Sequence, residues 1–228
     1  MRFSLLFFPG VGVVIAALLY LLYIFFTFWN LSSVFFSAAA VFSVIVFTGG
    51  LHLDGYCDTV DALCSRQERE QKLKILKDVH LGAFAVVYTI ALLLLQFGAW
   101  HQLFLKPHCL GMVLISFIIS RSLGALALVS FPAAKKEGLG YTFRNQASQR
   151  IIKIVLVCYL LLCFTVLFYI AVLPATVIIL ALLISYLWFY RLSKKHFGGL
   201  TGDLTGFYLV VCETLILVLG AVIGGLIT

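Results

Sequence analysis

Seven apolar runs, separated by short polar connections, dominate this sequence. Most approach or exceed the length that an α-helix needs to cross the hydrocarbon core of a bilayer, about 20 residues. Helices satisfy their backbone hydrogen bonds internally, as a lipid environment requires. We therefore expect an all-α polytopic integral membrane protein with about seven transmembrane helices. The predicted spans are residues 5–28, 31–48, 83–100, 109–131, 154–172, 175–190 and 204–227.

The composition agrees with a membrane protein. Hydrophobic residues make up 63% of the 228 residues and charged residues 11%, whereas soluble domains average about 45–50% and about 25%. The connections are too short to hold a separate soluble domain. We expect residues 1–228 to form a single membrane-embedded catalytic domain, in contact with the lipid bilayer.

The net charge of +7 is explained by its distribution along the chain. If the N-terminus is cytoplasmic and there are seven spans, fourteen of the sixteen Lys and Arg residues lie in the inner connections. This is the arrangement that the positive-inside rule favours. The basic charge therefore indicates membrane orientation and no nucleic-acid partner.

Residues 49–82 contain most of the groups that could do chemistry. Four of the five aspartates are here, and the orientation places them at the cytoplasmic face. If the segment is helical, the i, i+4, i+7 spacing puts Asp54, Asp58 and Asp61 on one face, within about 60° of each other. Carboxylates this close repel unless a cation lies between them, and hard divalent cations prefer oxygen ligands. Gly55 would let a ligand or another helix approach the backbone closely.

A solvated acidic helix end outside the membrane is the alternative interpretation of these aspartates. Such ends usually mix bases with the acids, but no Lys or Arg occurs between Gly49 and Ser65. The charged segment that follows, 65–78, is predicted to be a short helix on the membrane surface. Its Glu–Lys pairs at i, i+4 support a helix, namely Glu68 with Lys72 and Glu70 with Lys74.

Arg121 lies near the middle of the fourth predicted span, where an unpaired charge is costly. It could form a structural ion pair with Glu213 of the last span, or reach a phosphate in a cavity open to the cytoplasm. Asp203 begins the last span and could cap that helix, bind a metal or substrate, or do both. Three further candidates could bind substrate or simply lie at the interface: His52, Lys77 and His80.

Clustered carboxylates, nearby bases and a cytoplasmic opening suit a diphosphate substrate, whose oxygens a divalent ion would neutralise. The chain has no P-loop, GxSxG or HExxH pattern. A short internal similarity also occurs: GGLHLD at 49–54 and GGLTGD at 198–203 share four positions. We interpret them as two similar local corners at the inner face.

Three blocks in order along the chain carry a family resemblance: GGLHLDGYCDTVDAL (49–63), LKILKDVHLGAF (73–84) and GGLTGD (198–203). The sequence resembles the cobalamin synthase family, adenosylcobinamide-GDP ribazoletransferase. The resemblance implies a Mg²⁺-dependent transfer late in vitamin B12 assembly, in the cytoplasmic (inner) membrane of a prokaryote, with the active site facing the cytoplasm. The donor would be adenosylcobinamide-GDP and the acceptor α-ribazole or its 5′-phosphate, with GMP released; an oligomer is compatible with the sequence.

On this basis we expect Asp54, Asp58 and Asp61 to form the Mg²⁺ cluster and act in catalysis. Asp78 would complete the cluster or place the acceptor, and Asp203 would approach from the last span. The remaining substrate-binding candidates are His52, Lys77, His80 and Arg121, of which Lys77 and Arg121 would hold phosphates.

Two other functions fit a membrane protein with clustered acids. A CDP-alcohol phosphotransferase would carry DGxxAR, but this chain lacks the arginine after its first aspartates. An ion-coupled transporter would want carboxylates at the bilayer midplane, whereas here only Glu213 is predicted to lie that deep.

Overall fold

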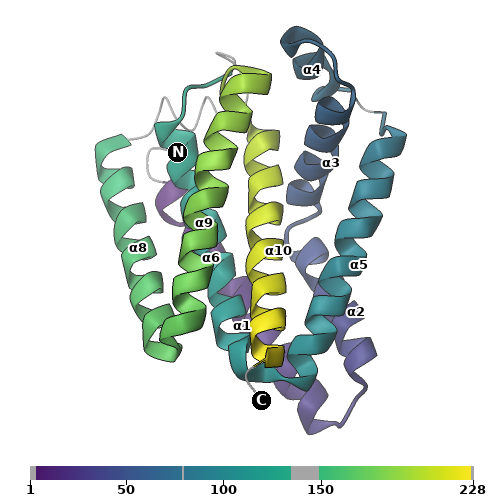
Figure 1. Cartoon of the computed structure of the whole chain (residues 1–228), viewed down its shortest axis with the longest axis vertical. Helices are drawn as coiled ribbons and strands as arrows, with labels where there is room; N and C mark the ends of the chain where they lie inside the picture. The colour runs from purple at the N-terminus through teal and green to yellow at the C-terminus, as the bar shows by residue number, and fades with distance from the viewer. Residues whose placement is uncertain (1–3, 79, 135–148, 227–228) are drawn as a thin grey trace.

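The computed structural model describes residues 4–78, 80–134 and 149–226. Apart from one isolated bridge between Ala133 and Leu200, these residues form helices and their connections, which confirms the all-α prediction. The elements are η1 (Ser4–Leu6), α1 (Phe8–Phe28), α2 (Ser33–Phe47), α3 (Leu51–Cys64), α4 (Arg69–Ile75), α5 (Ala83–Leu105), η2 (Pro107–Cys109), α6 (Leu110–Ser130), α8 (Gln149–Ile170), α9 (Val172–Leu192), η3 (Ser193–Phe197) and α10 (Gly202–Leu226) (Figure 1).

Six helical segments of the described chain are long and apolar enough to cross a bilayer: α1, α5, η2 with α6, α8, α9 with η3, and α10. Helices α2 and α3 meet the same criterion only as a pair, which is bent by 90° at their junction. Counting this broken pair as one span gives the seven that the sequence predicts. The protein is therefore a multi-pass membrane protein.

Helices α6 and α10 form the centre of the bundle. In their most apolar windows 78% of the η2–α6 residues and 56% of the α10 residues are buried, against 17–33% in the other spanning helices. Figure 1 shows α10 in the middle of the bundle, with α8 and α9 on one side and α3 and α5 on the other. The outer helices expose many large apolar side chains, as contact with lipid requires.

The second span differs from the prediction, which placed one crossing at 31–48 and the acidic stretch outside it. Helix α2 has only 15 residues, a length of about 22 Å at 1.5 Å per residue. It ends at a pair of glycines with positive φ, 61° at Gly49 and 73° at Gly50, a conformation that L-residues rarely adopt. The chain turns there, and α3 continues inside the bundle.

Helix α3 packs antiparallel against the first half of α10. A Cβ at Gly55 would lie 2.7 Å from the Asp203 carbonyl oxygen, and one at Gly206 would lie 3.4 Å from the Cα of His52. Beside this crossing the rings of Tyr56 and Phe207 stack with centroids 5.5 Å apart. From the sequence, a ligand or another helix is expected to approach the backbone at Gly55, and in the structure helix α10 does so.

The predicted surface helix is present but shorter than 65–78. Helix α4 has seven residues, and it buries Lys72 and Leu73. Figure 1 shows α4 beyond the end of α3, at the end of the bundle from which α10 starts.

The two glycine corners each have a first glycine with left-handed φ, as the similarity of their sequences predicts, but their second glycines differ in conformation. At the second corner, φ is 74° at Gly198 and 158° at Gly199. Each glycine pair ends one helix, and each of the next helices, α3 and α10, has an aspartate in its first turn.

The packing of α3 on α10 can be tested with two alanine substitutions. Gly55→Ala should lower the stability by about 1–3 kcal/mol, because its new methyl group meets backbone that must move. Gly98→Ala is the control, since a Cβ at that helical glycine meets nothing within 4 Å and alanine favours helix by up to about 1 kcal/mol. Unfolding in detergent measures both changes, and equal stabilities of the two variants would contradict the close packing.

Candidate active site

Carboxylates from two helices meet where α3 crosses α10. Asp54 and Asp58 lie on α3, and Asp203 lies in the first turn of α10 against Gly55. The negative charges of Asp54, Asp203 and Asp61 all act on the half-buried carboxyl of Asp58. The structure therefore places Asp54, Asp61 and Asp203 within electrostatic range of Asp58. Their catalytic and metal-binding roles stay predictions.

Asp61 also has a structural contact that the sequence did not reveal. One carboxylate oxygen accepts a hydrogen bond from the backbone N–H of Gly82, and the other accepts one from the N–H of Ala85 at 2.9 Å. These N–H groups belong to the beginning of α5, where helical donors lack partners within the helix and negative charge is favourable. Asp61 thus caps α5 from the neighbouring helix α3.

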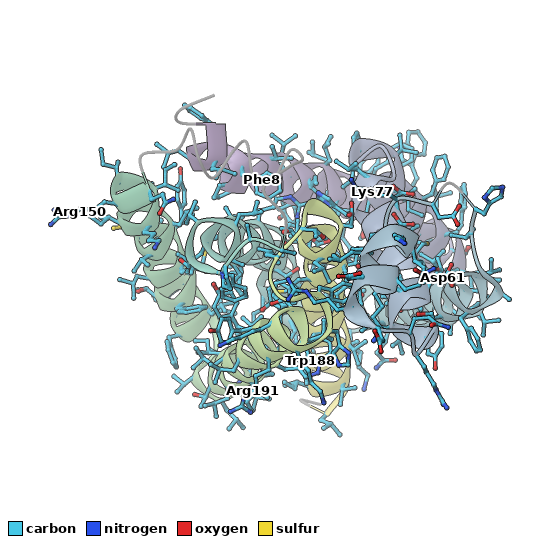
Figure 2. The ribbon with its side chains drawn as sticks, turned by 90° about the horizontal axis from the view of Figure 1, so that it is seen from above. Phe8, Asp61, Lys77, Arg150, Trp188 and Arg191 are labelled. Atoms are coloured by element: carbon cyan, nitrogen blue, oxygen red, sulfur yellow. The ribbon has the colours of Figure 1, made fainter. Side chains whose placement is uncertain are left out.

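Asp78 and His80 form a pair of their own at the surface. The His80 Nδ1 lies 2.8 Å from an Asp78 carboxylate oxygen, and 88% of the His80 side chain and 52% of the Asp78 side chain are exposed. Asp78 is not among the charges that act on Asp58. Viewed from the end of the bundle that carries α4, Lys77 and Asp61 lie on the side of α3 and α5, far from Arg150 of α8 (Figure 2).

His52 lies on the inner side of α3, away from the aspartate face, as its position in the helix predicts. Its ring meets Phe8 of α1 edge-on, with centroids 6.2 Å apart. The buried Nδ1 has no hydrogen-bond partner among the residues that the structure describes, and the charge of Arg121 acts on the ring. This histidine therefore lies near the polar centre of the bundle.

Arg121 forms the structural ion pair that the sequence offers as one of two possibilities. Its Nη1 lies 2.5 Å from Oε1 of Glu213, and the side chains are 0% and 9% exposed. Ser120 Oγ donates to the same glutamate oxygen at 2.7 Å, and the Phe117 carbonyl accepts from Arg121 Nη1 at 3.0 Å. The phosphate-binding role of Arg121 stays a prediction.

Within the described ranges, no three His, Cys, Asp or Glu side chains converge closely enough to bind one metal ion. The chemistry of the donors nevertheless suits a hard cation, because the neighbouring charges that act on Asp58 are all carboxylates.

Comparisons with known proteins identify the family. The sequence matches the cobalamin-5-phosphate synthase family over residues 1–221. The chain belongs to this family. Curated relatives carry the name adenosylcobinamide-GDP ribazoletransferase. The protein from Lachnoclostridium phytofermentans is 39% identical over 215 residues, which cover 93% of this chain and 81% of the relative. A relative from Clostridium botulinum is 36% identical over 212 residues, 90% of this chain and 81% of its own length.

A third cobalamin-5-phosphate synthase relative, from Clostridium perfringens, is 32% identical over 217 residues, 94% of this chain and 86% of its own. No solved structure matches the chain. The family match extends over both blocks that meet at the α3–α10 crossing, 49–63 and 198–203.

Two positions in this member of the family became evident only from the structure. The cap of Asp61 on α5 joins residues 21 and 24 positions apart, and the only local sign was a glycine, Gly82, just before an apolar run. Lys72 is buried against His196, although its spacing from Glu68 suggested a surface ion pair.

The Arg121–Glu213 pair predicts an unequal cost of single and double substitutions. Glu213→Gln should destabilise the protein by about 3–5 kcal/mol, because it leaves a buried guanidinium without its counter-charge. The double variant Arg121→Met/Glu213→Leu should recover most of this loss, since it removes both charges. Unfolding in detergent of the double variant and of its two single variants, Arg121→Met and Glu213→Leu, gives the coupling energy.

Asp78→Asn is the control for this cycle. Its ion pair with His80 is exposed, so its loss should change stability by less than about 1 kcal/mol. A double variant whose loss equals the sum of the two single losses would argue against a coupled buried pair.

Proposed function

We propose that this chain transfers the adenosylcobinamide-phosphate group from adenosylcobinamide-GDP to α-ribazole or α-ribazole 5′-phosphate, and releases GMP. The products are adenosylcobalamin or its 5′-phosphate. The family match and the printed names of the relatives support this transferase activity. One observation carries the assignment to a site. Asp54 and Asp58 lie close to Asp203 where α3 crosses α10, although they come from blocks about 140 residues apart in the sequence.

The reaction needs a proton acceptor from the protein and groups that align the donor with the acceptor. A ribose hydroxyl of the acceptor attacks the phosphorus on the cobinamide side, a new P–O bond forms, and the P–O bond to GMP breaks. A carboxylate of the cluster accepts the hydroxyl proton, and positioned groups hold the donor and acceptor in line. The α3–α10 crossing offers several carboxylates for these roles on two helices that are held rigidly by their packing.

Mg²⁺ is the proposed metal, and Asp54, Asp58 and Asp203 would hold it. When bound, Mg²⁺ supplies neutralisation of the diphosphate oxygens and of the leaving group. The mutual repulsion of these carboxylates around half-buried Asp58 supports a cation at this place. Asp61 would contribute its negative charge while it caps α5, and Asp78 with His80 lies at the edge where an acceptor could enter.

The cluster is proposed to face the cytoplasm, in the cytoplasmic (inner) membrane of a prokaryote. The basic residues of α4 and of the segment after α9 are on the same end of the bundle as α3, which is the cytoplasmic end by the positive-inside rule. The substrates are made in the cytoplasm in this proposal, so they reach the aspartates without crossing the bilayer. An oligomer is compatible with this arrangement.

The alternatives are less well supported. Neither a CDP-alcohol phosphotransferase nor an ion-coupled transporter is favoured by a family match that extends over residues 1–221. Glu213, the carboxylate near the middle of α10 that a transporter could use, is paired with Arg121.

Asp58→Asn tests the carboxylate assignment. The purified variant should release GMP from adenosylcobinamide-GDP and α-ribazole 5′-phosphate at least about a hundredfold more slowly. Its thermal stability should be unchanged or higher, because the amide relieves like-charge repulsion. Glu70→Gln, on the exposed side of α4, is the control and should keep full activity. Wild-type rates in Asp58→Asn would remove this residue from the mechanism.

Metal dependence is tested separately by chelation. Dialysis of the wild-type protein against EDTA should abolish GMP release, and added Mg²⁺ should restore it. Asp54→Asn should need at least about tenfold more Mg²⁺ for half-maximal activity, because the site loses one charged ligand. Full activity in EDTA would exclude Mg²⁺ from the reaction.

A further inference from the structure

Lys72 is a buried lysine that has no acidic partner in the described part of the chain. Only 7% of the residue is exposed, and its Nζ lies 3.2 Å from Nδ1 of His196 in η3. The ion pairs among the described residues are His80–Asp78 and Arg121–Glu213, so neither involves Lys72. A buried ammonium without a counter-charge is unfavourable, and a bound anion would remove that cost.

Arg69, three residues before Lys72 on α4, reaches the same place. A Cβ at Gly198 would overlap the Arg69 guanidinium, so this side chain lies directly against the second glycine corner. The corner follows the π-helical turn η3, and π-turns of this kind occur frequently at functional sites. Glycine at position 198 therefore serves two purposes, since φ is positive there and the arginine occupies the space of a side chain.

The local charge is positive from more than one element. The charges of Lys72 and Lys195 both act on His196, while Arg69 covers the corner that follows. The two acids of this region, Glu68 and Glu70, have exposed side chains and form no ion pair within the described part of the chain. Cations from α4 and η3 thus converge here, and no carboxylate of residues 4–78, 80–134 or 149–226 forms an ion pair with them.

This cationic cluster borders the acidic one. Gly198 and Gly199 precede the first turn of α10, which carries Asp203, and α4 follows α3, which carries Asp54 and Asp58. Helices α3 and α10 are held together at Gly55. A substrate with two phosphate groups, or two substrates with one each, could therefore contact the carboxylate side and the cationic side of the same corner.

We propose that Arg69, Lys72 and His196 form a binding site for a phosphate group of a nucleotide substrate. This inference rests on the proposed function and extends it to the nucleotide. Two sources share the chemistry: the guanosine-side phosphate of the donor, which leaves as GMP, and the 5′-phosphate of α-ribazole 5′-phosphate. Guanidinium and ammonium groups bind phosphate oxygens through charge-assisted hydrogen bonds, and the imidazole supplies a further N–H.

Binding to the purified full-length protein in detergent, measured by calorimetry, tests the site. Lys72→Met should weaken the binding of the phosphate source by at least about tenfold, the effect of losing one charge-assisted hydrogen bond. The matched control is Lys74→Met, two residues along the same helix with an exposed side chain, which should bind within about twofold of wild type. Weaker GMP binding with unchanged α-ribazole 5′-phosphate binding would assign the site to the donor, and the reverse result to the acceptor.

Thermal unfolding without ligand separates binding from folding. A lysine with only a structural role would lower the melting temperature when replaced, whereas removal of an uncompensated buried charge should leave it unchanged or raise it. If Lys72→Met does not fold, Arg69→Gln is the second variant, since its guanidinium lies at the exposed side of the cluster. Binding of GMP and of α-ribazole 5′-phosphate that is unchanged in the folded variants would overturn the proposal.

The binding measurement does not depend on turnover. If the wild-type protein binds GMP through Lys72 but transfers nothing to either α-ribazole or α-ribazole 5′-phosphate, the proposed function fails and the anion site stands. If transfer occurs but Lys72→Met and Arg69→Gln leave binding of both phosphates unchanged, the function stands and the anion site fails.

Discussion

The close approach of α3 to α10 is the contact on which the site depends. Helix α3 has only 14 residues, too few to cross a bilayer alone, and its position is set by the helices beside it. Because Gly55 and Gly206 have no side chains, the two backbones come close enough to place Asp54, Asp58 and Asp203 at one crossing. Small residues serve this purpose widely in membrane helix packing, where lipid offers no hydrophobic drive for association.

Two polar connections inside the bundle join neighbouring helices. Asp61 caps α5 across the gap from α3, so the acidic helix is tied to a second neighbour by charge as well as by packing. Arg121 and Glu213 join α6 to α10, with Ser120 sharing the glutamate oxygen. The first connection holds α3 against α5 and the second holds α10 against α6, while the packing at Gly55 holds α3 against α10. A site built from separate helices needs such contacts in order to keep its geometry.

Much of the fold could be predicted because apolar length is a strong signal in a membrane protein. The spans follow from this length. The high cost of a charge in lipid predicted the pairing of Arg121 with Glu213, and the conformational freedom of glycine predicted similar corners at the two glycine pairs. The bend after α2 was missed because the apolar run stops at Thr48 and hydropathy cannot show that the polar helix after it turns back into the bundle. Contacts between residues far apart in the sequence, such as Asp61 with Gly82 and Lys72 with His196, produce no periodic pattern in the sequence from which they could be predicted.

The bend at Gly49 and Gly50 also makes the orientation of α3 independent of the length of α2. In an unbroken helix, the insertion of one residue rotates everything beyond it by about 100°. The aspartates of α3 would then no longer face α10. The 90° bend interrupts that coupling. Helix α2 can therefore change in length, for instance to suit bilayers of different thickness, while the orientation of the acidic helix α3 stays the same.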